Sequence, residues 1–326
     1  MEPFLFPGNG GPGKKRKCEI WAVGGGKGGT GKTFLTSALG TCLALRRKKV
    51  ILVDADLGGC NLHTLFGIPK PYRSLSDFIE RKARLEDLVV PSGVAGLGLI
   101  SGNPGSLDSG SIKHAQKLKL FRHIGALDAD FVIMDLGAGS HVNTLDAFLI
   151  ADKKIVAITP EITAIENLYQ FIKAALFRKL KTSPAVEDIK GVFQRVWERR
   201  AELGIRHLRD LVARIAEASP QAGAIVEREL RDFNIHVVLN QVKSAQSIQV
   251  GASVKSVCIK HMGFMASYPG FVNFDEGVAR SINSRQPLMR AQPRSECARQ
   301  IERLADNLLG RRQVTLAPVE YARARG

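Results

Sequence analysis

The sequence has no long hydrophobic run. No stretch approaches the roughly 18 consecutive apolar residues that a membrane-spanning helix needs. The first residues also lack the apolar core of a signal peptide, because glycines interrupt them between Gly8 and Gly13. We therefore expect a cytoplasmic protein, one that can still lie at the cytoplasmic face of the inner membrane.

Paired metal-binding residues are also missing. The five cysteines are odd in number and none forms a C-x-x-C pair: Cys18, Cys42, Cys60, Cys258 and Cys297. This pattern argues against a disulfide framework and against a cysteine zinc site. The seven histidines show no H-E-x-x-H spacing, and Ser140-His141 lies outside any G-x-S-x-G elbow, so metalloprotease and serine-hydrolase chemistry are not indicated.

Acidic residues are too few to balance the basic ones. The chain of 326 residues has 47 Lys and Arg against 31 Asp and Glu, a net charge of +16. Such a charge attracts polyanions such as DNA, anionic lipid or acidic protein surfaces. It is equally compatible with a basic surface that only keeps the protein in solution. The hydrophobic content of 44% is that of a globular protein.

Short apolar runs alternate with stretches of helical periodicity. The expected strands are 19–23, 50–53, 97–100, 131–134, 155–158, 235–239 and 263–266, and the expected helices are 33–46, 114–125, 162–180 and 296–309. This order predicts an α/β fold with a doubly wound, mostly parallel sheet. Functional residues are then expected beyond the carboxyl ends of the strands. Met262 and Met265 are expected to pack in the core.

The chain divides into one large domain and two tails. Residues 1–17, with the basic run Lys14–Lys17, are expected to form a disordered tail, and 310–326 form a basic one. Between them, residues 18–309 form the predicted domain. An arginine-rich helical insertion interrupts this domain at about 181–232. The insertion can be a partner-binding surface or simply a set of solvent-exposed helices.

The strongest motif is the segment Gly26–Thr33, which matches the P-loop pattern G-x-x-x-x-G-K-[ST] between a strand and a helix. Backbone N–H groups of the glycine-rich turn converge on phosphates, and the helix N-terminus adds its positive end. The pattern assigns Lys32 to the β- and γ-phosphates and the Thr33 hydroxyl to Mg²⁺. The nucleotide-binding set from this loop is Gly26, Lys27, Gly28, Gly29, Thr30, Gly31, Lys32 and Thr33.

Aspartates follow two of the buried strands. Asp54 and Asp135 each come directly after an apolar run. A carboxylate there is costly unless it serves a ligand or metal, although a helix cap or turn is the simpler alternative. With a P-loop upstream, we favour metal support for Asp135 and a catalytic or metal role for Asp54 and Asp56 together.

A second lysine gives the loop its family likeness. With Lys27 it reads K-G-G-T-G-K-T, which resembles the deviant Walker A motif of the MinD/ParA family over roughly Cys18 to Leu309. The resemblance implies that Lys27 contacts the nucleotide of a dimer partner. It also implies that Asp56 orients the attacking water, that Asp54 lies near the metal's water shell and that Asp135 is the Walker B carboxylate.

Two weaker assignments also come from the family. Thr159-Pro160-Glu161 resembles a segment near the nucleotide, and Asn240 matches the asparagine that reads adenine. From the residues alone, Asn240 can be a turn former and Glu161 a helix cap. The segments Asn61–Thr64, Leu136–Gly139 and Pro160–Thr163 resemble the MinD-like subgroup that includes the FlhG flagellar-number regulators.

The resemblance implies an ATPase that uses ATP and Mg²⁺ and forms a homodimer with ATP. A protein activator or cargo, an anionic membrane surface and non-specific DNA are the partners to expect. The implied role is spatial regulation, of flagellar number or division site. A ParA-like partition ATPase is the main alternative, and a biosynthetic enzyme on the same fold is the second. In the MinD group a C-terminal amphipathic helix binds membrane, and the apolar spacing of the helix 296–309 fits that role and packing on the domain equally well. The tail 310–326 lacks the wide apolar face that an interfacial helix needs.

Overall fold

The computed structural model describes residues 18–56, 59–69, 71–102, 113–187, 189–205 and 208–310. Both predicted tails lie outside these residues, apart from Gly310, and so do Leu57, Gly58 and Arg206. Among the helices of the described chain, none combines the length and the apolar character that crossing a bilayer requires.

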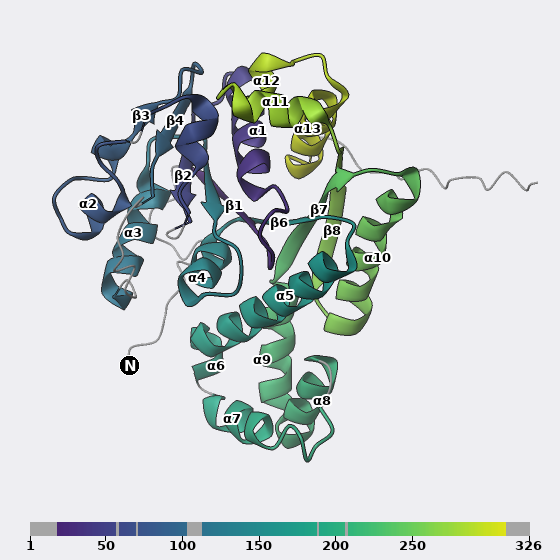
Figure 1. The fold of residues 1–326 in the computed structure, drawn as a ribbon. Coiled ribbons are helices and arrows are strands. Elements are labelled where there is room, and N and C mark those ends of the chain that lie inside the picture. The colour runs from purple at the N-terminus through teal and green to yellow at the C-terminus, as the bar shows by residue number, and fades with distance from the viewer. Residues whose placement is uncertain are drawn as a thin grey trace, which may run out of the picture.

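A single eight-stranded sheet forms the centre of the molecule (Figure 1). Its order is β3-β4-β2-β5-β1-β6-β7-β8, and only the β3–β4 pair is antiparallel. The strands are β1 Glu19–Gly24, β2 Val50–Ala55, β3 Val90–Pro91, β4 Leu97–Ile100, β5 Phe131–Leu136, β6 Lys153–Ile158, β7 Asn234–Val242 and β8 Met265–Asn273. The inner strands are apolar throughout because helices cover both faces. The predicted α/β class with a mostly parallel sheet is confirmed.

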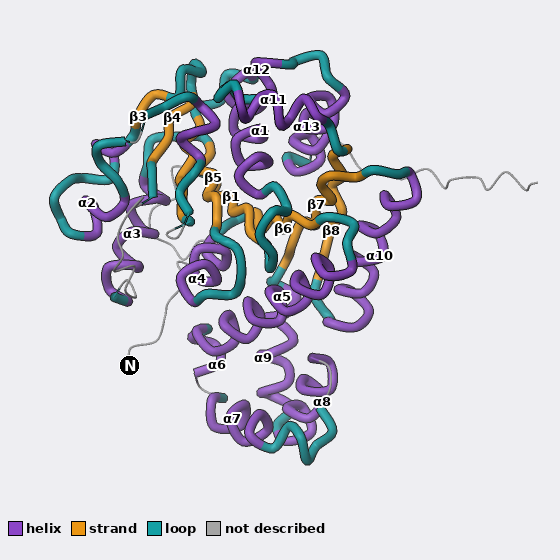
Figure 2. The backbone as a smooth tube through the Cα atoms, viewed as in Figure 1, coloured by secondary structure: helices purple, strands orange, loops and turns teal. Residues whose placement is uncertain are grey.

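Helices pack on both faces of the sheet (Figure 2). Helices α1 and α13 cover one face, with α11 and α12 beside them, and α3, α4, α5 and α10 cover the other. The bounds are α1 Lys32–Leu45, α2 Leu75–Ile79, α3 His114–Ala126, α4 Val142–Ile150, α5 Ile162–Thr182, α10 Gln249–Val257, α11 Glu276–Asn283, α12 Leu288–Ala291 and α13 Glu296–Leu308. Helical turns lie at η1 Leu62–Phe66, η2 Glu86–Leu88, η3 Ala245–Ile248 and the π-helical η4 Cys258–Met262.

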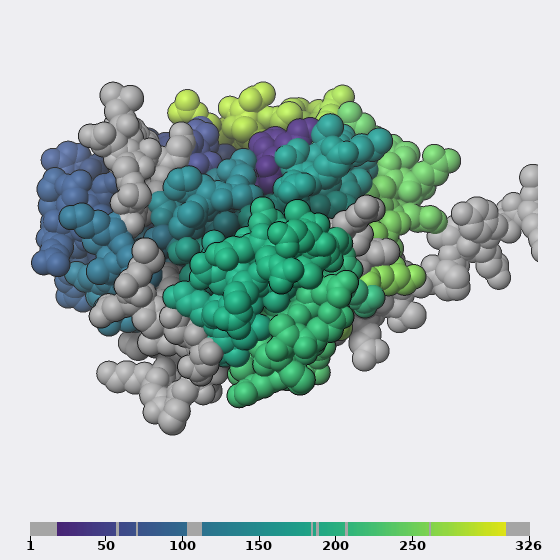
Figure 3. Space-filling model, turned by 90° about the horizontal axis from the view of Figure 1, so that it is seen from below, coloured from purple at the N-terminus to yellow at the C-terminus, as the bar shows by residue number. Residues whose placement is uncertain are grey.

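The arginine-rich segment folds as helices, as its periodicity predicts. It comprises α6 Pro184–Glu187, α7 Lys190–Glu198, α8 Leu208–Ala218 and α9 Pro220–Arg231. These helices form a lobe beyond α5, which dominates the face of the molecule seen in Figure 3. Helices α8 and α9 approach closely at Gly223, where a Cβ would lie 2.5 Å from that of Ala216. Phe193, Ile215 and Val226 join the same core as the sheet.

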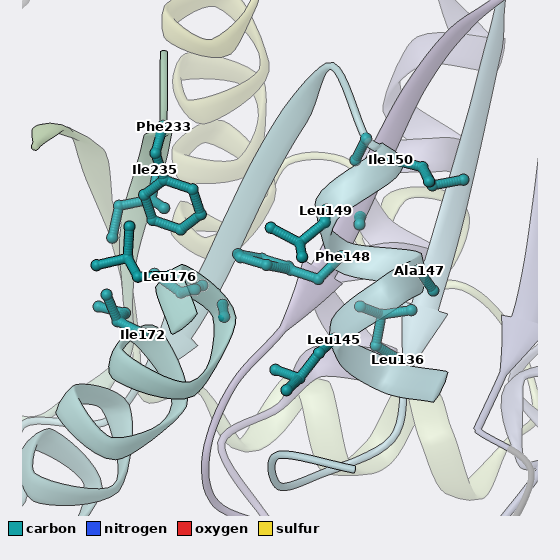
Figure 4. Packing of buried hydrophobic residues seen from close by; sticks show 14 of the residues in the cluster. Leu136, Leu145, Ala147, Phe148, Leu149, Ile150, Ile172, Leu176, Phe233 and Ile235 are labelled. Carbon is teal, nitrogen blue, oxygen red and sulfur yellow. The ribbon is translucent and has the colours of Figure 1, made fainter. Parts of the chain in front are cut away.

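Aromatic packing fixes α4 against α5. Phe148 and Phe171 meet edge to face with ring centroids 5.0 Å apart. Figure 4 shows Phe148 and Leu149 projecting from α4 toward the side where Ile172 and Leu176 of α5 lie. These side chains are buried, so the two helices that follow β5 and β6 form one rigid layer under the sheet.

The C-terminal part differs from the sequence-based expectation in its last strand and in the position of Met265. The last strand is not 263–266 but Met265–Asn273, and Met265 is 56% exposed rather than part of the core. Gly263, with φ of 75°, ends the π-helical turn before it. The helix expected at 296–309 is α13, and it buries Ile301, Leu304 and Leu308 against α1 and β8. Its apolar face is therefore used for packing on the domain.

A buried ion triad ties three helices together. The Asp146 carboxylate on α4 is fully buried and accepts from Lys117 Nζ on α3 at 2.5 Å. It also accepts from Arg178 Nε on α5 at 2.7 Å, and a second bond from the same guanidinium makes the contact bidentate. The triad fixes the positions of α3, α4 and α5 relative to one another. Removing one member would leave a buried charge without its partner, which is strongly destabilising.

We therefore predict that Asp146→Ala lowers the free energy of unfolding by about 3–5 kcal/mol, because it leaves the buried Lys117 ammonium unpaired. Urea denaturation followed by circular dichroism measures the loss. The control is Asp128→Ala, whose partner Lys49 is exposed, and it should change stability little. Equal midpoints for the two variants would contradict the assignment.

Candidate functional site

The P-loop runs from the end of β1 to the start of α1. Gly29 and Gly31 have φ of 78° and 84°, a region that side chains with a Cβ rarely adopt. A Cβ added to Gly28 or Gly29 would meet nothing within 4 Å. The turn is therefore open on one side, with backbone N–H groups available to a bound anion.

The other side of the loop is closely packed. A Cβ on Gly26 would lie 2.0 Å from the backbone oxygen of Asn167 on α5, and one on Gly31 would lie 2.2 Å from Asn240 Nδ2. These glycines are required because the backbone of the loop is wedged between α5 and the end of β7. The same packing holds the open side in a fixed position.

Two amides at the end of β7 support the loop directly. Asn240 is buried and its Nδ2 donates to the Thr30 oxygen at 2.9 Å. Gln241 Nε2 donates to the Gly29 oxygen, also at 2.9 Å. Sequence reasoning missed Gln241. Asn240 is brought to the P-loop as expected, while its predicted contact with adenine stays a prediction.

The P-loop lysine is buried beneath the turn. Lys32 is 8% exposed, and its Nζ donates to the Lys27 oxygen at 3.1 Å. Burial lowers its pKa, and the negative charges of Asp135 and Asp56 oppose that shift. The ammonium is therefore held close to carboxylates, where it stays available to a further anion.

Asp54 and Asp135 lie side by side, because β2 and β5 pair in parallel with these two residues in register. Both are buried. Burial raises the pKa of Asp54 to about 6. Burial, followed by the charge of Asp54, raises the pKa of Asp135 to about 7. Two adjacent buried carboxyls with raised pKa values are typical of a functional site.

Each aspartate has a distinct environment. Asp54 accepts backbone N–H groups from Asp56 and Leu62 at 3.2 and 3.1 Å, so it also organises the loop after β2. Asp135 accepts from the Thr36 hydroxyl at 3.3 Å and from the side chain of Thr33. Thr36, one turn after Thr33 on α1, was not singled out, although its i+3 spacing places it on the same face.

Asp56 lies across from the loop that follows β5. A Cβ on Gly137 would lie 2.9 Å from Asp56 Oδ1, so this glycine leaves room for the carboxylate. The Cys60 thiol donates to the backbone oxygen of Asp56 at 2.8 Å. Gly139 N in turn donates to the Gly25 oxygen at 3.2 Å. The loops after β1, β2 and β5 thus converge on one point.

Lys27 is held within its own chain. Its Nζ donates to Glu161 Oε2 and to Thr163 Oγ1, both at 2.9 Å. Glu161 occupies the N-cap position of α5 but makes no side-chain cap bond, so it pairs with Lys27 instead. The hydrogen bond from Lys27 lowers the pKa of Glu161. The contact of Glu161 with nucleotide stays a prediction, and the role of Thr163 was missed.

The oxygen atoms that the protein offers fit Mg²⁺ only when phosphates and water complete its coordination. Across the described residues, no group of three or more His, Cys, Asp or Glu side chains is arranged to hold a metal. The Thr33 hydroxyl and the Asp135 carboxylate offer hard oxygen ligands beside the open turn. Mg²⁺ accepts such a partial set, because it keeps several waters and uses substrate phosphates for the remaining positions.

Comparisons with known proteins agree with this geometry. Residues 21–288 match the model of the CobQ/CobB/MinD/ParA nucleotide binding domain. The antiactivator FleN of Pseudomonas aeruginosa is 32% identical over 49% of this chain and 58% of its own length. The flagellum site-determining protein YlxH of Helicobacter pylori is 34% identical over 49% of this chain and 54% of its own length. The chain thus spans between half and two thirds of these relatives.

A solved structure shows the same fold. The septum site-determining protein MinD of Pyrococcus horikoshii, complexed with Mg-ADP, aligns with a TM-score of 0.60. The alignment covers 89% of this chain and 96% of that protein at 19% identity.

The raised pKa of Asp135 gives a pH dependence. The carboxyl ionises near 3.8 in the unfolded chain but at about 7 in the folded protein. The folded protein therefore keeps a proton that the unfolded chain has lost, and its stability falls as the pH rises between these values. Without nucleotide or metal, Asp135→Asn should make this fall shallower than in the parent protein.

Urea midpoints at pH 5 and pH 8 in EDTA provide the measurement. The surface variant Asp128→Asn is the control and should keep the dependence of the parent. A parent-like dependence in Asp135→Asn would show that this carboxyl does not carry it.

Proposed function

The chain belongs to the CobQ/CobB/MinD/ParA family of nucleotide-binding domains, and from this premise we propose that it is a Mg²⁺-dependent ATPase acting as a dimeric switch. One observation carries the proposal: a single P-loop bears a buried lysine, Lys32, and an exposed second lysine, Lys27. The buried lysine serves the nucleotide of its own chain. The exposed one can reach a second chain.

Phosphate binding follows from the open turn. The N–H groups around Gly28 and Gly29 and the N-terminus of α1 together present positive charge to the phosphates. Lys32 adds a full charge from below. Asn240 and Gln241 keep the turn in this shape, because their side-chain amides donate hydrogen bonds to the backbone oxygens of Thr30 and Gly29. Asn240 would read adenine and Glu161 would lie near the nucleotide, as the resemblance to the family implies.

Hydrolysis needs a metal and an oriented water. Thr33 and Asp135 would hold Mg²⁺, with Asp54 beside them, and the ion supplies charge neutralisation at the phosphates. A metal cation there would also favour the ionised form of both carboxyls, which their burial disfavours. Asp56 faces the loop at Gly137 and orients the attacking water.

Lys27 acts in trans in this proposal. Its ion pair with Glu161 is exposed, with 37% and 61% of the two side chains accessible, so breaking it costs little. On dimerisation the ammonium would leave Glu161 and Thr163 for the phosphates of the partner chain. A cation placed there offsets charge that develops in the transition state, as an arginine finger does.

Lys27→Ala should therefore keep ATP binding but lower the turnover number about 10³-fold, because it removes only the trans cation. Fluorescent ATP titration and phosphate release measure the two properties. Lys32→Ala should lose ATP binding itself, and Lys82→Ala, at an exposed lysine, should change neither. Undiminished turnover in Lys27→Ala would rule out the trans role.

We further propose spatial regulation as the cellular role, in the manner of a flagellum or division-site regulator. Support comes from the likeness to the flagellum site-determining protein and to FleN. The ATP state would be a homodimer that presents a surface to a protein activator or cargo and to anionic membrane. Two basic tails per dimer strengthen such membrane binding, because the second tail binds at a high effective concentration.

DNA partition is the second candidate. The net charge of +16 favours it, because clustered Lys and Arg bind phosphates without reading sequence. The two roles differ in what the ATP-bound dimer binds: anionic membrane in the first and DNA in the second. A biosynthetic enzyme on this fold would instead need a second substrate site beside the P-loop.

Asp56→Ala, which should hold the dimer in its ATP state, separates these candidates. We expect it to sediment with phosphatidylglycerol vesicles in ATP and much less in ADP, because dimerisation doubles the basic tails. Phosphatidylcholine vesicles and a chain truncated at Gly310 are the controls. ATP-dependent binding to DNA alone would replace the positioning role with partition.

A further inference from the structure

A cavity of about 510 Å³ lies where the inserted helices meet the rest of the molecule. Its described walls come from α5, from the end of α7 and the residues just after it, from α8, and from α10 with the π-helical turn after it. No residue of the P-loop is among the described residues that line it. The cavity is therefore separate from the nucleotide site, and its volume is that of a small-molecule site.

The walls of this cavity are mainly apolar. Leu176 of α5 and Leu211 of α8 are fully or almost fully buried. Phe177 and Trp197 are packed at a tilt with ring centroids 4.4 Å apart, and Met262 also lines the cavity. Two aromatic rings and several aliphatic side chains favour a ligand with an apolar body.

The cavity's charged residues are all basic. Lys173 and Arg200 line it and are exposed, and its described lining residues include neither Asp nor Glu. Arg200 lies 4.7 Å above the Trp197 ring and donates to the Trp197 backbone oxygen at 3.0 Å. Neither contact of Arg200 is with a carboxylate, so its guanidinium remains able to pair with an anion. Lys173 adds a second positive charge to the lining.

Two neutral polar groups complete the lining. Tyr169 and Gln170 of α5 are one turn before Lys173. Burial raises the pKa of Tyr169, so its hydroxyl stays protonated and can donate a hydrogen bond. Donors thus gather along one helix while the remaining walls are apolar.

We propose that this cavity binds a small amphipathic anion, with an apolar chain or ring against Leu176, Leu211 and Met262 and a single carboxylate paired with Lys173 and Arg200. A polyphosphate would leave the apolar walls unused, and a neutral hydrocarbon would leave the cations unpaired. An acid with one charged end satisfies both halves. The proposal does not depend on ATP hydrolysis, since binding is measured without nucleotide.

Trp197 reports directly on occupancy. The chain has two tryptophans, and the other, Trp21, is fully buried in the core. Dodecanoate, titrated below its micelle concentration, should shift the emission of the full chain in a saturable way. The signal should be absent in Trp197→Phe, where calorimetry still measures binding.

The charge of the head group is tested by matched probes. Dodecanoate should bind about ten-fold or more tightly than 1-dodecanol, whose chain is the same but whose head is neutral. Dodecyltrimethylammonium should bind more weakly still. Equal binding of all three, or no saturable binding of dodecanoate, would overturn the proposal.

The cations are tested by variants that should fold normally, because both side chains are exposed. The double variant Lys173→Gln with Arg200→Gln should reduce dodecanoate binding to the level of dodecanol. Arg199→Gln is the control: Arg199 neighbours Arg200 but pairs with Glu202 at 2.9 Å and does not line the cavity. An undiminished affinity in the double variant, or an equal loss in the control, would overturn the assignment.

Discussion

Buried charge at the carboxyl edge of the sheet constrains the rest of the site. Parallel pairing of β2 with β5 brings Asp54 next to Asp135, and two neighbouring carboxylates in a dry place repel each other. The Lys32 ammonium, backbone N–H groups and threonine hydroxyls partly compensate them, and raised pKa values show that the compensation is incomplete. A nucleotide with its metal would complete it. The Asp54 and Asp135 carboxylates would be stabilised by the positive charge of the metal, and the Lys32 ammonium would be stabilised by the negative charge of the phosphates.

Much of this arrangement could be predicted from the sequence. The central strands are uninterrupted apolar runs, and the P-loop pattern combines glycines, lysine and threonine at fixed spacing, so fold and phosphate site both followed. The Asp residues were found because each ends such a strand. The sequence did not predict contacts between elements that are distant along the chain. Gln241 supports Gly29, and Thr163 holds Lys27, only because strands and helices distant in sequence meet in space.

The bounds predicted for the last strand, 263–266, were wrong, and the composition of β8 explains why. Pro269 and Gly270 lie in the middle of β8, and these residues usually end a strand. They are tolerated because β8 is at the edge of the sheet, where a missing N–H costs nothing on the open side. The same edge position leaves Met265 exposed although its residue type favours the core. Sequence periodicity does not reveal which strand is last.

Helix α5 serves several parts of the molecule along its 21 residues, about 30 Å at 1.5 Å per residue. Its first turn holds Lys27, its second abuts Gly26, its middle lines the apolar cavity and its last turns bind Asp146. Loss or gain of one residue within it would rotate everything beyond that point by about 100°. The number of residues between Thr163 and Arg178 is therefore constrained by all of these contacts at once.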